Sequence, residues 1–462
     1  MNRNINLTEG NIASTLTKLA LPIMGTSFIQ MAYNLTDIMW LGRLSTKAVA
    51  AAGIVGFFIW FGAALVMISQ IGVGVGVAQS YGKGDMVAAS KYISNGFQLN
   101  ITIGILYSLF LFFFRNYIIG FFHIDDPEVV RLAIEYMIII SIGIIFHFLN
   151  PIFSTTLNSS GNSVTPFKVN TIGLVANIIL DPILIFGLGP IPALGIRGAA
   201  IATISSQFVV TLMFITLGKR KQTLYSHVEL VSKPNFEYIK TIFKIGFPPS
   251  LQMGIHATIS MILARIVSSF GPVAIAVQAI GSQIESLSWM TAEGFSTAIS
   301  AFVGQNYGAK KFDRIVEGYK KAMELVGGIG LFASLLLIFA ARPLFTIFTP
   351  EDPLAIKEGI IYLRVLGLSQ FFMSIEIGTS GAFNGLGRTL PPTIVGITLN
   401  ALRIPIAIVL SGYTVLGLAG VWWSITLTSI VKGIILVIWF KYLLNNKLDK
   451  DNIDSIERII PL

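Results

Sequence analysis

The chain has 462 residues, of which 54% are hydrophobic and 12% are charged, with a net charge of +9 and no cysteine. This composition excludes an ordinary soluble domain, and the lack of cysteine excludes disulfides, thiol nucleophiles and thiolate metal sites. The positive charge does not indicate nucleic acid, because the basic residues gather in short loops, where they orient a membrane protein.

Long runs of nearly uncharged residues recur along the chain, and each could cross the roughly 30 Å hydrocarbon layer of a bilayer as a helix. No alternating pattern typical of a membrane barrel appears. We therefore expect an all-α integral membrane protein with twelve transmembrane helices. The expected spans are residues 15–42, 48–77, 92–114, 130–150, 165–187, 196–217, 239–268, 273–303, 320–341, 356–378, 391–412 and 417–442.

The first span carries a polar stripe, formed by Gln30, Tyr33, Asn34 and Asp37. Their spacing of i, i+3, i+4 and i+7 places them on one face of a helix. A carboxylate near the middle of a membrane helix costs about 3 kcal/mol or more, so Asp37 is expected to face a wet cavity or a partner. The alternative is that Asp37 lies near the helix end and is solvated there.

Basic residues are concentrated after the sixth and eighth spans, which predicts that these loops, and both termini, are cytoplasmic. The most polar internal stretch lies between the sixth and seventh expected spans and is predicted to be a linker between two halves. We expect an N-lobe at residues 1–218, a linker at 219–238, a C-lobe at 239–444 and a C-terminal tail at 445–462.

The two halves repeat each other. Four pairs of motifs share an offset of 226 residues: Leu21-Pro22 with Phe247-Pro248, Ala78-Gln79-Ser80-Tyr81-Gly82 with Gly304-Gln305-Asn306-Tyr307-Gly308, Asp126-Pro127 with Asp352-Pro353, and Leu157-Asn158-Ser159-Ser160-Gly161 with Phe383-Asn384-Gly385-Leu386-Gly387. Two pseudo-symmetric six-helix lobes are expected to enclose a central cleft, in which transporters place their substrates.

Ionisable residues do not repeat between the halves. The fifth span carries Asn177 and Asp181, and Thr203 follows on the sixth, whereas the second half has apolar residues opposite Asp37, Asp181 and Thr203. If Asp181 meets Asp37, two carboxylates share a poorly solvated pocket, so that one holds a proton or both hold a cation. The alternative is that Asp181-Pro182 marks a helix break in which the carboxylate caps backbone amides.

Several of these motifs together resemble the multidrug and toxic compound extrusion (MATE) transporters. They are Tyr33-Asn34-Leu35-Thr36-Asp37 after Pro22, Asn177-Ile178-Ile179-Leu180-Asp181-Pro182, Gly198-Ala199-Ala200-Ile201-Ala202-Thr203, and Val303-Gly304-Gln305-Asn306-Tyr307-Gly308-Ala309. The resemblance implies a twelve-helix exporter of amphipathic, often cationic compounds in exchange for protons or sodium ions. It also implies an N-lobe cation site at Asp37, Asn177, Asp181 and Thr203, a drug cavity around Gln30, Tyr33 and Asn34, and bending of the first helix at Pro22.

One departure from the family pattern concerns the C-lobe. Where the NorM-like branch has acidic residues on the seventh and tenth spans, this chain has His256 and Met373. The pattern therefore looks more like the DinF or MepA-like branch, whose working carboxylates lie in the N-lobe. A lone membrane histidine is more often an interhelical hydrogen-bonding group than a proton carrier. Four further charged residues, Glu285, Glu293, Arg403 and Lys432, are expected to pair within the C-lobe.

These observations predict a cation-coupled antiporter that expels hydrophobic organic cations across the plasma membrane. Asp37 and Asp181 would exchange a proton or sodium ion, Asn177, Thr203 and the Ala199 carbonyl would complete the ion shell, and Asn150 would contact the drug with Gln30, Tyr33 and Asn34. We expect a monomer without a cofactor or resident metal, beyond a transient Na⁺, and without a nucleic-acid partner.

Two other functions are less favoured by the sequence. A flippase for a lipid-linked precursor would favour a basic cavity, whereas the inward faces here carry acids. An intramembrane enzyme is disfavoured because no cysteine, paired-histidine motif or Gly-x-Ser-x-Gly elbow is present. No ATP-binding motif occurs either, so that an ion gradient is the expected energy source.

Overall fold

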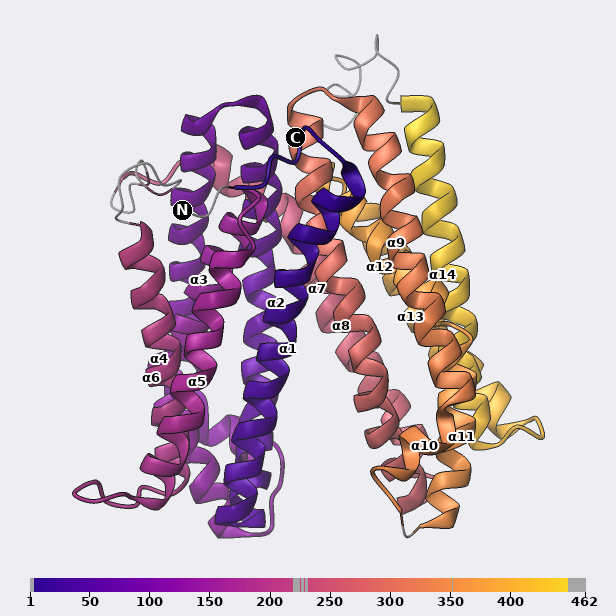
Figure 1. The fold of residues 1–462 in the computed structure, drawn as a ribbon. Helices are drawn as coiled ribbons and strands as arrows, with labels where there is room; N and C mark the ends of the chain where they lie inside the picture. Colours follow the sequence, from indigo (N-terminus) through magenta and orange to yellow (C-terminus); the bar gives the residue numbers. More distant parts are fainter. Residues whose placement is uncertain (1–3, 219–224, 226–227, 229–231, 351, 448–462) are drawn as a thin grey trace. The chain divides into compact units, whose positions relative to one another are not determined.

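The computed structural model of the protein describes residues 4–218, 225, 228, 232–350 and 352–447. These residues form helices joined by short loops, with one isolated bridge between Leu188 and Ile191. The helices are α1 Ile12–Leu44, α2 Thr46–Lys83, α3 Met86–Gly120, α4 Pro127–Ser159, α5 Val164–Phe186, α6 Ile196–Gly218, α7 Phe236–Ser268, α8 Pro272–Gly308, α9 Phe312–Phe339, α10 Ala341–Thr346, α11 Pro353–Gly367, α12 Gln370–Gly385, α13 Leu390–Gly412 and α14 Leu418–Lys447 (Figure 1).

The predicted all-α membrane fold is confirmed. In the described part of the chain, ten helices are long and apolar enough to cross a membrane, and α11 with α12, bent by 47°, supplies an eleventh span. The remaining expected span is α8, whose 37 residues are ample for a crossing but include Glu285 and Glu293. Twelve crossings are therefore consistent with the structure.

The helices begin where short polar residues cap them. Ser45, Asp85, Asp126 and Asp352 each accept a backbone N–H bond from the first turn of the helix that follows. Proline takes the first position of α4 and of α11, where no backbone donor is needed. The helices then continue beyond the apolar runs, because their polar ends extend past the hydrocarbon layer.

By helix packing, the chain divides into two compact units. Unit 1 comprises residues 4–5 and 25–250, and unit 2 comprises residues 6–24 and 251–447, as far as the described residues go. The boundaries thus lie inside α1, two residues after Pro22, and inside α7, one residue after Pro249. The lobes predicted at 1–218 and 239–444 differ from these units by the first parts of α1 and α7. Most of the predicted linker and tail lies outside the described residues.

The repeat seen in the sequence is also present in the packing. In unit 1, α4 packs against α2, α3 and α6, and α5 packs against α6. In unit 2, α12 packs against α8, α9 and α14, and α13 packs against α14. The loop glycines of the repeat match as well, since Gly161 and Gly387 have φ of 87° and 74°. Each unit is therefore one copy of the same helical arrangement.

Candidate functional site

The first helix brings Tyr33 and Asp37 into unit 1, one helical turn apart on the same face. The side chain of Tyr33 is buried and that of Asp37 is partly buried. Gln30 and Asn34, the other two residues of the predicted polar stripe, are exposed. The stripe is therefore divided between an inward edge and an exposed edge.

Helix α6 connects this face to the rest of the site through Thr203. The Tyr33 hydroxyl donates to the Thr203 carbonyl oxygen at 3.1 Å. The Thr203 hydroxyl lies 3.2 Å from Asp37 Oδ2 and 3.0 Å from the Ala199 carbonyl oxygen. A hydroxyl has one proton, so Thr203 can donate to only one of these two acceptors at a time.

Helix α5 contributes Asn177 and Asp181, both of which have no exposed surface. Asn177 Nδ2 donates to Asp181 Oδ1 at 3.2 Å, across one helical turn. The helix continues through Asp181 and Pro182 to Phe186, which rules out the alternative that Asp181 caps a helix break. Glycine at position 198 permits this packing, because a Cβ there would overlap the Leu184 carbonyl of α5.

The two carboxyl groups interact directly with each other. Among the described residues, no hydrogen-bond donor reaches Asp37 Oδ1, Asp181 Oδ2 or Asn177 Oδ1, although all three oxygens are buried. The six ion pairs in this part of the chain involve neither aspartate. A buried acceptor without a donor is costly, so the site favours a proton between the carboxyls or a small cation among the oxygens.

Two tyrosines surround the carboxyl pair. Tyr136 of α4 is buried and interacts with Asp37, Asp181 and Thr203. No sequence pattern distinguishes Tyr136, because an isolated tyrosine in an apolar span is usually a packing residue. Tyr33 also interacts with Ser206 and Gln207 on α6, which extends the polar network along that helix.

Asn150 lies farther along this network, on α4. Its Nδ2 donates to the side-chain and backbone oxygens of Gln207, at 2.8 and 3.0 Å, and its Oδ1 accepts from Thr211 at 2.8 Å. These bonds occupy both polar ends of the side chain. Asn150 thus holds α4 against α6, and Gln207 links it to Tyr33.

Unit 2 contains a different set of buried charges. Lys432 forms an ion pair with Glu376 at 3.0 Å, with side-chain exposures of only 8% and 11%. Arg403 donates to the hydroxyls of Thr428 and Ser429, both at 3.0 Å. The predicted pairing among Glu285, Glu293, Arg403 and Lys432 is wrong: in the described residues Lys432 pairs with Glu376, and the other three form no ion pair.

His256 contacts Asn400 of α13 at 3.3 Å, as expected for an interhelical hydrogen bond. Glu285 accepts hydrogen bonds from Tyr362 and Gln370, at 3.4 and 3.1 Å. Glu285 and Glu376 therefore each have a donor or a cation on at least one oxygen, although Glu376 Oε2 is buried without a partner, as are Asp37 Oδ1 and Asp181 Oδ2 in unit 1. The difference between the units is that Glu376 has a fixed cation, whereas neither aspartate forms an ion pair among the described residues. In the described residues, no group of three histidine or acidic side chains could hold a metal ion.

Comparison with known proteins gives the family. A family profile described as MatE matches the chain twice, at residues 22–183 and 248–409. The chain belongs to the MATE family. The second match starts at residue 248 and the first at residue 22, which reproduces the repeat offset of 226 residues.

Relatives in the family extend over nearly the whole chain. A probable multidrug resistance protein NorM from Thermotoga maritima is 30% identical over 449 residues, which cover 97% of this chain and 96% of that protein. The multidrug export protein MepA from Staphylococcus haemolyticus is 24% identical and covers 97% of both chains. A crystal structure described as MATE in the bent conformation has a TM-score of 0.90 at 24% identity, covering 97% of this chain and 99% of that one. The protein is therefore a multidrug efflux transporter of the MATE family and not an enzyme.

Proposed function

We propose that this MATE protein is an antiporter that exports amphipathic organic cations in exchange for protons or sodium ions. The observation that carries the proposal is the buried pair of Asp37 and Asp181, which interact with each other while one oxygen of each lacks a donor. Two carboxylates so close in a poorly solvated pocket cannot both ionise cheaply. A bound proton or cation removes the energetic cost of two neighbouring negative charges, and release of that ion restores the cost.

The ligand set suits both candidate ions. A sodium ion would find oxygens from Asp37, Asp181, the Asn177 amide, the Thr203 hydroxyl and the Ala199 carbonyl, the hard ligands that such cations prefer. A proton would bridge the two carboxyls, and the Thr203 hydroxyl and Asn177 amide would stabilise the remaining negative charge.

An organic cation would be attracted to the same negative charge, which couples the two binding events. We assign drug contact to Gln30, Tyr33, Asn34 and Asn150. Gln30 and Asn34 lie on α1 seven and three residues before Asp37, and both are exposed. Tyr33 and Asn150 would act through Gln207, to which both are linked.

Transport would follow alternating access, with the cargo in a cleft between the two halves at the level of the bilayer midplane. Pro22 would bend α1, since it removes one backbone hydrogen bond from that helix. The protein would act as a monomer in the plasma membrane with both termini in the cytoplasm, as the basic loops indicate. It would need no cofactor.

The test is ethidium efflux from proteoliposomes containing the purified protein. A pH gradient and a Na⁺ gradient are imposed separately, and the Asp37→Asn variant serves as the uncoupled control. We expect one gradient to drive ethidium transport by the native protein and neither to drive it in the variant. Failure of both gradients with the native protein would contradict ion-coupled antiport.

A further inference from the structure

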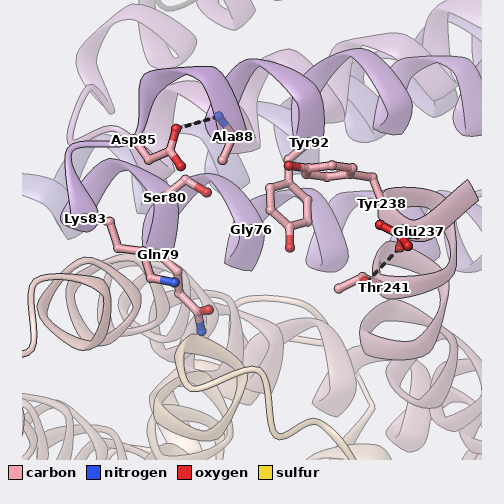
Figure 2. A pocket seen from close by; sticks show the side chains of 10 residues that line it. All are labelled: Gly76, Gln79, Ser80, Lys83, Asp85, Ala88, Tyr92, Glu237, Tyr238 and Thr241. Atoms are coloured by element: carbon pink, nitrogen blue, oxygen red, sulfur yellow. Dashed lines mark hydrogen bonds between the residues drawn. The ribbon is translucent and has the colours of Figure 1, made fainter. Parts of the chain in front are cut away.

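A hollow of about 330 Å³ lies in unit 1, away from the carboxyl pair, where α2 ends and α3 and α7 begin (Figure 2). It is lined by Gly76, Gln79, Ser80 and Lys83 of α2, by Asp85, Ala88 and Tyr92 of α3 and its cap, and by Glu237, Tyr238 and Thr241 of α7. Because these three helices are membrane spans, the hollow is at the level where lipid headgroups lie.

Contacts among α2, α3 and α7 hold the walls of this hollow in place. Tyr92 and Tyr238 pack edge to face, with ring centroids 4.8 Å apart. Gly76 allows Tyr92 to lie against α2, because a Cβ at that position would overlap the tyrosine ring. The residue before α7 is held against α3, since the backbone N–H of Asn235 donates to Asn95 Oδ1 at 2.7 Å.

The charges around the hollow are mixed and separated. Figure 2 shows Lys83 and Gln79 on one side of the tyrosine pair, and Glu237 with Thr241 on the other. Lys83 and Glu237 are both exposed, and the six ion pairs of the described residues include neither. Asp85 already caps α3 by accepting from the Ala88 amide at 2.8 Å.

Exposed apolar side chains flank these charges. Val87 on the first turn of α3 is 67% exposed, and Phe236 on the first turn of α7 is 80% exposed. Such side chains beside a polar hollow are suited to contact with the upper part of acyl chains. A soluble zwitterion has no acyl chains to contact these apolar side chains, whereas a phospholipid does.

We propose that this hollow binds the headgroup of a zwitterionic phospholipid with a primary amine, such as phosphatidylethanolamine. The phosphate would be held by the Lys83 ammonium and the Gln79 amide. The lipid ammonium would be held by the Glu237 carboxylate beside the tyrosine pair, because the Tyr238 ring already has the Lys91 ammonium over it, 6.0 Å from the ring centroid. The bound lipid would fix the start of α7 against α2 and α3.

The experiment is native mass spectrometry of the full-length protein titrated with phosphatidylethanolamine and phosphatidylglycerol of identical acyl chains. We expect phosphatidylethanolamine to bind about fivefold more tightly than phosphatidylglycerol, which lacks the ammonium. Lys83→Ala and Glu237→Gln should each weaken phosphatidylethanolamine binding by about fivefold. Lys240→Ala and Glu317→Gln, which remove exposed charges outside the hollow, should leave binding unchanged.

Two further measurements make the test decisive. Glu237→Lys should reverse the preference toward phosphatidylglycerol, a gain that mere damage to the protein would not produce. Soluble phosphoethanolamine should bind at least tenfold more weakly than the lipid, because it lacks acyl chains. Equal binding of the two lipids, or binding that Lys83→Ala and Glu237→Gln leave unchanged, would overturn the proposal. Equal affinity for phosphoethanolamine would also overturn it, since the ligand would then be a soluble amine phosphate.

Discussion

Buried acids in this protein occur in two arrangements that differ in their partners. In unit 2, Glu376 has a tethered cation, the ammonium of Lys432, at 3.0 Å. In unit 1, Asp37 and Asp181 have each other, and the donors that reach them leave one oxygen of each unpaired. A fixed ion pair has no need of an external cation, whereas the acid pair does. This difference supports the proposal that the exchangeable site lies in unit 1.

The tethered pair predicts a large and specific stability effect. Lys432→Met should destabilise the protein by about 3 to 5 kcal/mol, because Glu376 would be left as an unpaired buried charge. The double variant Lys432→Met/Glu376→Leu should recover most of this loss. The measurement is thermal unfolding of the detergent-purified protein. Lys321→Met, which breaks an exposed pair with Glu324, is the matched control and should change little. An unstable double variant would show that the pair is not the cause.

At the level of single residues, the proximity of the acidic side chains could be predicted from the sequence, whereas their role in ion coupling stays a prediction. Spacing alone placed Tyr33 and Asp37 on one helical face and Asn177 and Asp181 on another, and the structure brings them together around Thr203. Tyr136 could not be predicted, since its role depends on how α4 packs against α5 and α6 and leaves no spacing signal in the chain.

At the level of elements, small residues determine how closely paired helices approach. A Cβ at Gly198 would overlap the Leu184 carbonyl of α5, and one at Gly420 would overlap the Leu410 carbonyl of α13. The two glycines end the matching motifs Gly195-Ile196-Arg197-Gly198 and Gly417-Leu418-Ala419-Gly420, which repeat at a shorter offset of 222 residues. Gly198 lies between α5 and α6, and Gly420 lies between α13 and α14. In unit 1 the same helix pair carries Asp181 and Thr203.

This contact predicts that the two glycines differ in their functional effect. Gly198→Ala and Gly420→Ala should each destabilise the protein by about 1 to 3 kcal/mol through overpacking. Gly198→Ala should also reduce transport per folded molecule, because it moves α6 relative to α5 at the ion site. Melting temperature and ethidium efflux are measured together, with Gly56→Ala, which has open space around it, as control. Equal transport by both variants would argue against a site shared between α5 and α6.

A polar contact between the starts of α2 and α4 predicts a pH effect on stability. Lys47 lies 2.9 Å from Asp126, which caps α4, and its ammonium holds the pKa of Asp126 below the usual range for aspartate. A lowered pKa in the folded state stabilises the protein above the unfolded pKa, and this contribution is lost as the pH falls through the folded pKa.

Lys47→Gln should therefore lower the melting temperature at neutral pH and have progressively less effect below about pH 4, as Asp126 becomes protonated. The measurement compares native and variant protein across this pH range. Lys240→Gln, which is exposed, is the control and should show no such trend. A difference that persists at low pH would indicate that the ion pair with Asp126 is not responsible.

The positions of the helices could be predicted where they depend on the apolar runs that cross the lipid bilayer. Apolar runs placed the spans near the observed helices: α5, α6 and α13 match their expected bounds within one residue, whereas α2, α3 and α4 extend beyond them. Ser45, Asp85 and Asp126 cap the starts of these three longer helices. The break between α11 and α12 was not predicted, since residues 356–378 contain no proline and the sequence favours one span there despite four charged side chains. The unit boundaries near Pro22 and Pro249 were also not predicted, because they depend on packing between helices distant in the sequence.

On the scale of the whole molecule, the chain uses one fold twice and has the buried Asp37–Asp181 pair in one copy only. The repeat appears in the motifs, in the helix packing and in the two matches to the family profile. The structural residues are duplicated, whereas Asp37 corresponds to the buried Leu263 in the second copy. Duplication thus supplies the fold, and divergence between the copies supplies the acid pair that we propose as the ion site.

Competition between ions and cargo tests this account most directly. Binding of tetraphenylphosphonium to the purified protein is measured as Na⁺ concentration and pH are varied, for the native protein and for Asp37→Asn and Asp181→Asn. If the acid pair exchanges a small cation for cargo, Na⁺ or H⁺ will weaken tetraphenylphosphonium binding by at least fivefold, and each substitution will abolish that dependence. Tetraphenylphosphonium affinity that is independent of both ions, or that depends on them equally in the native protein and both variants, would contradict it.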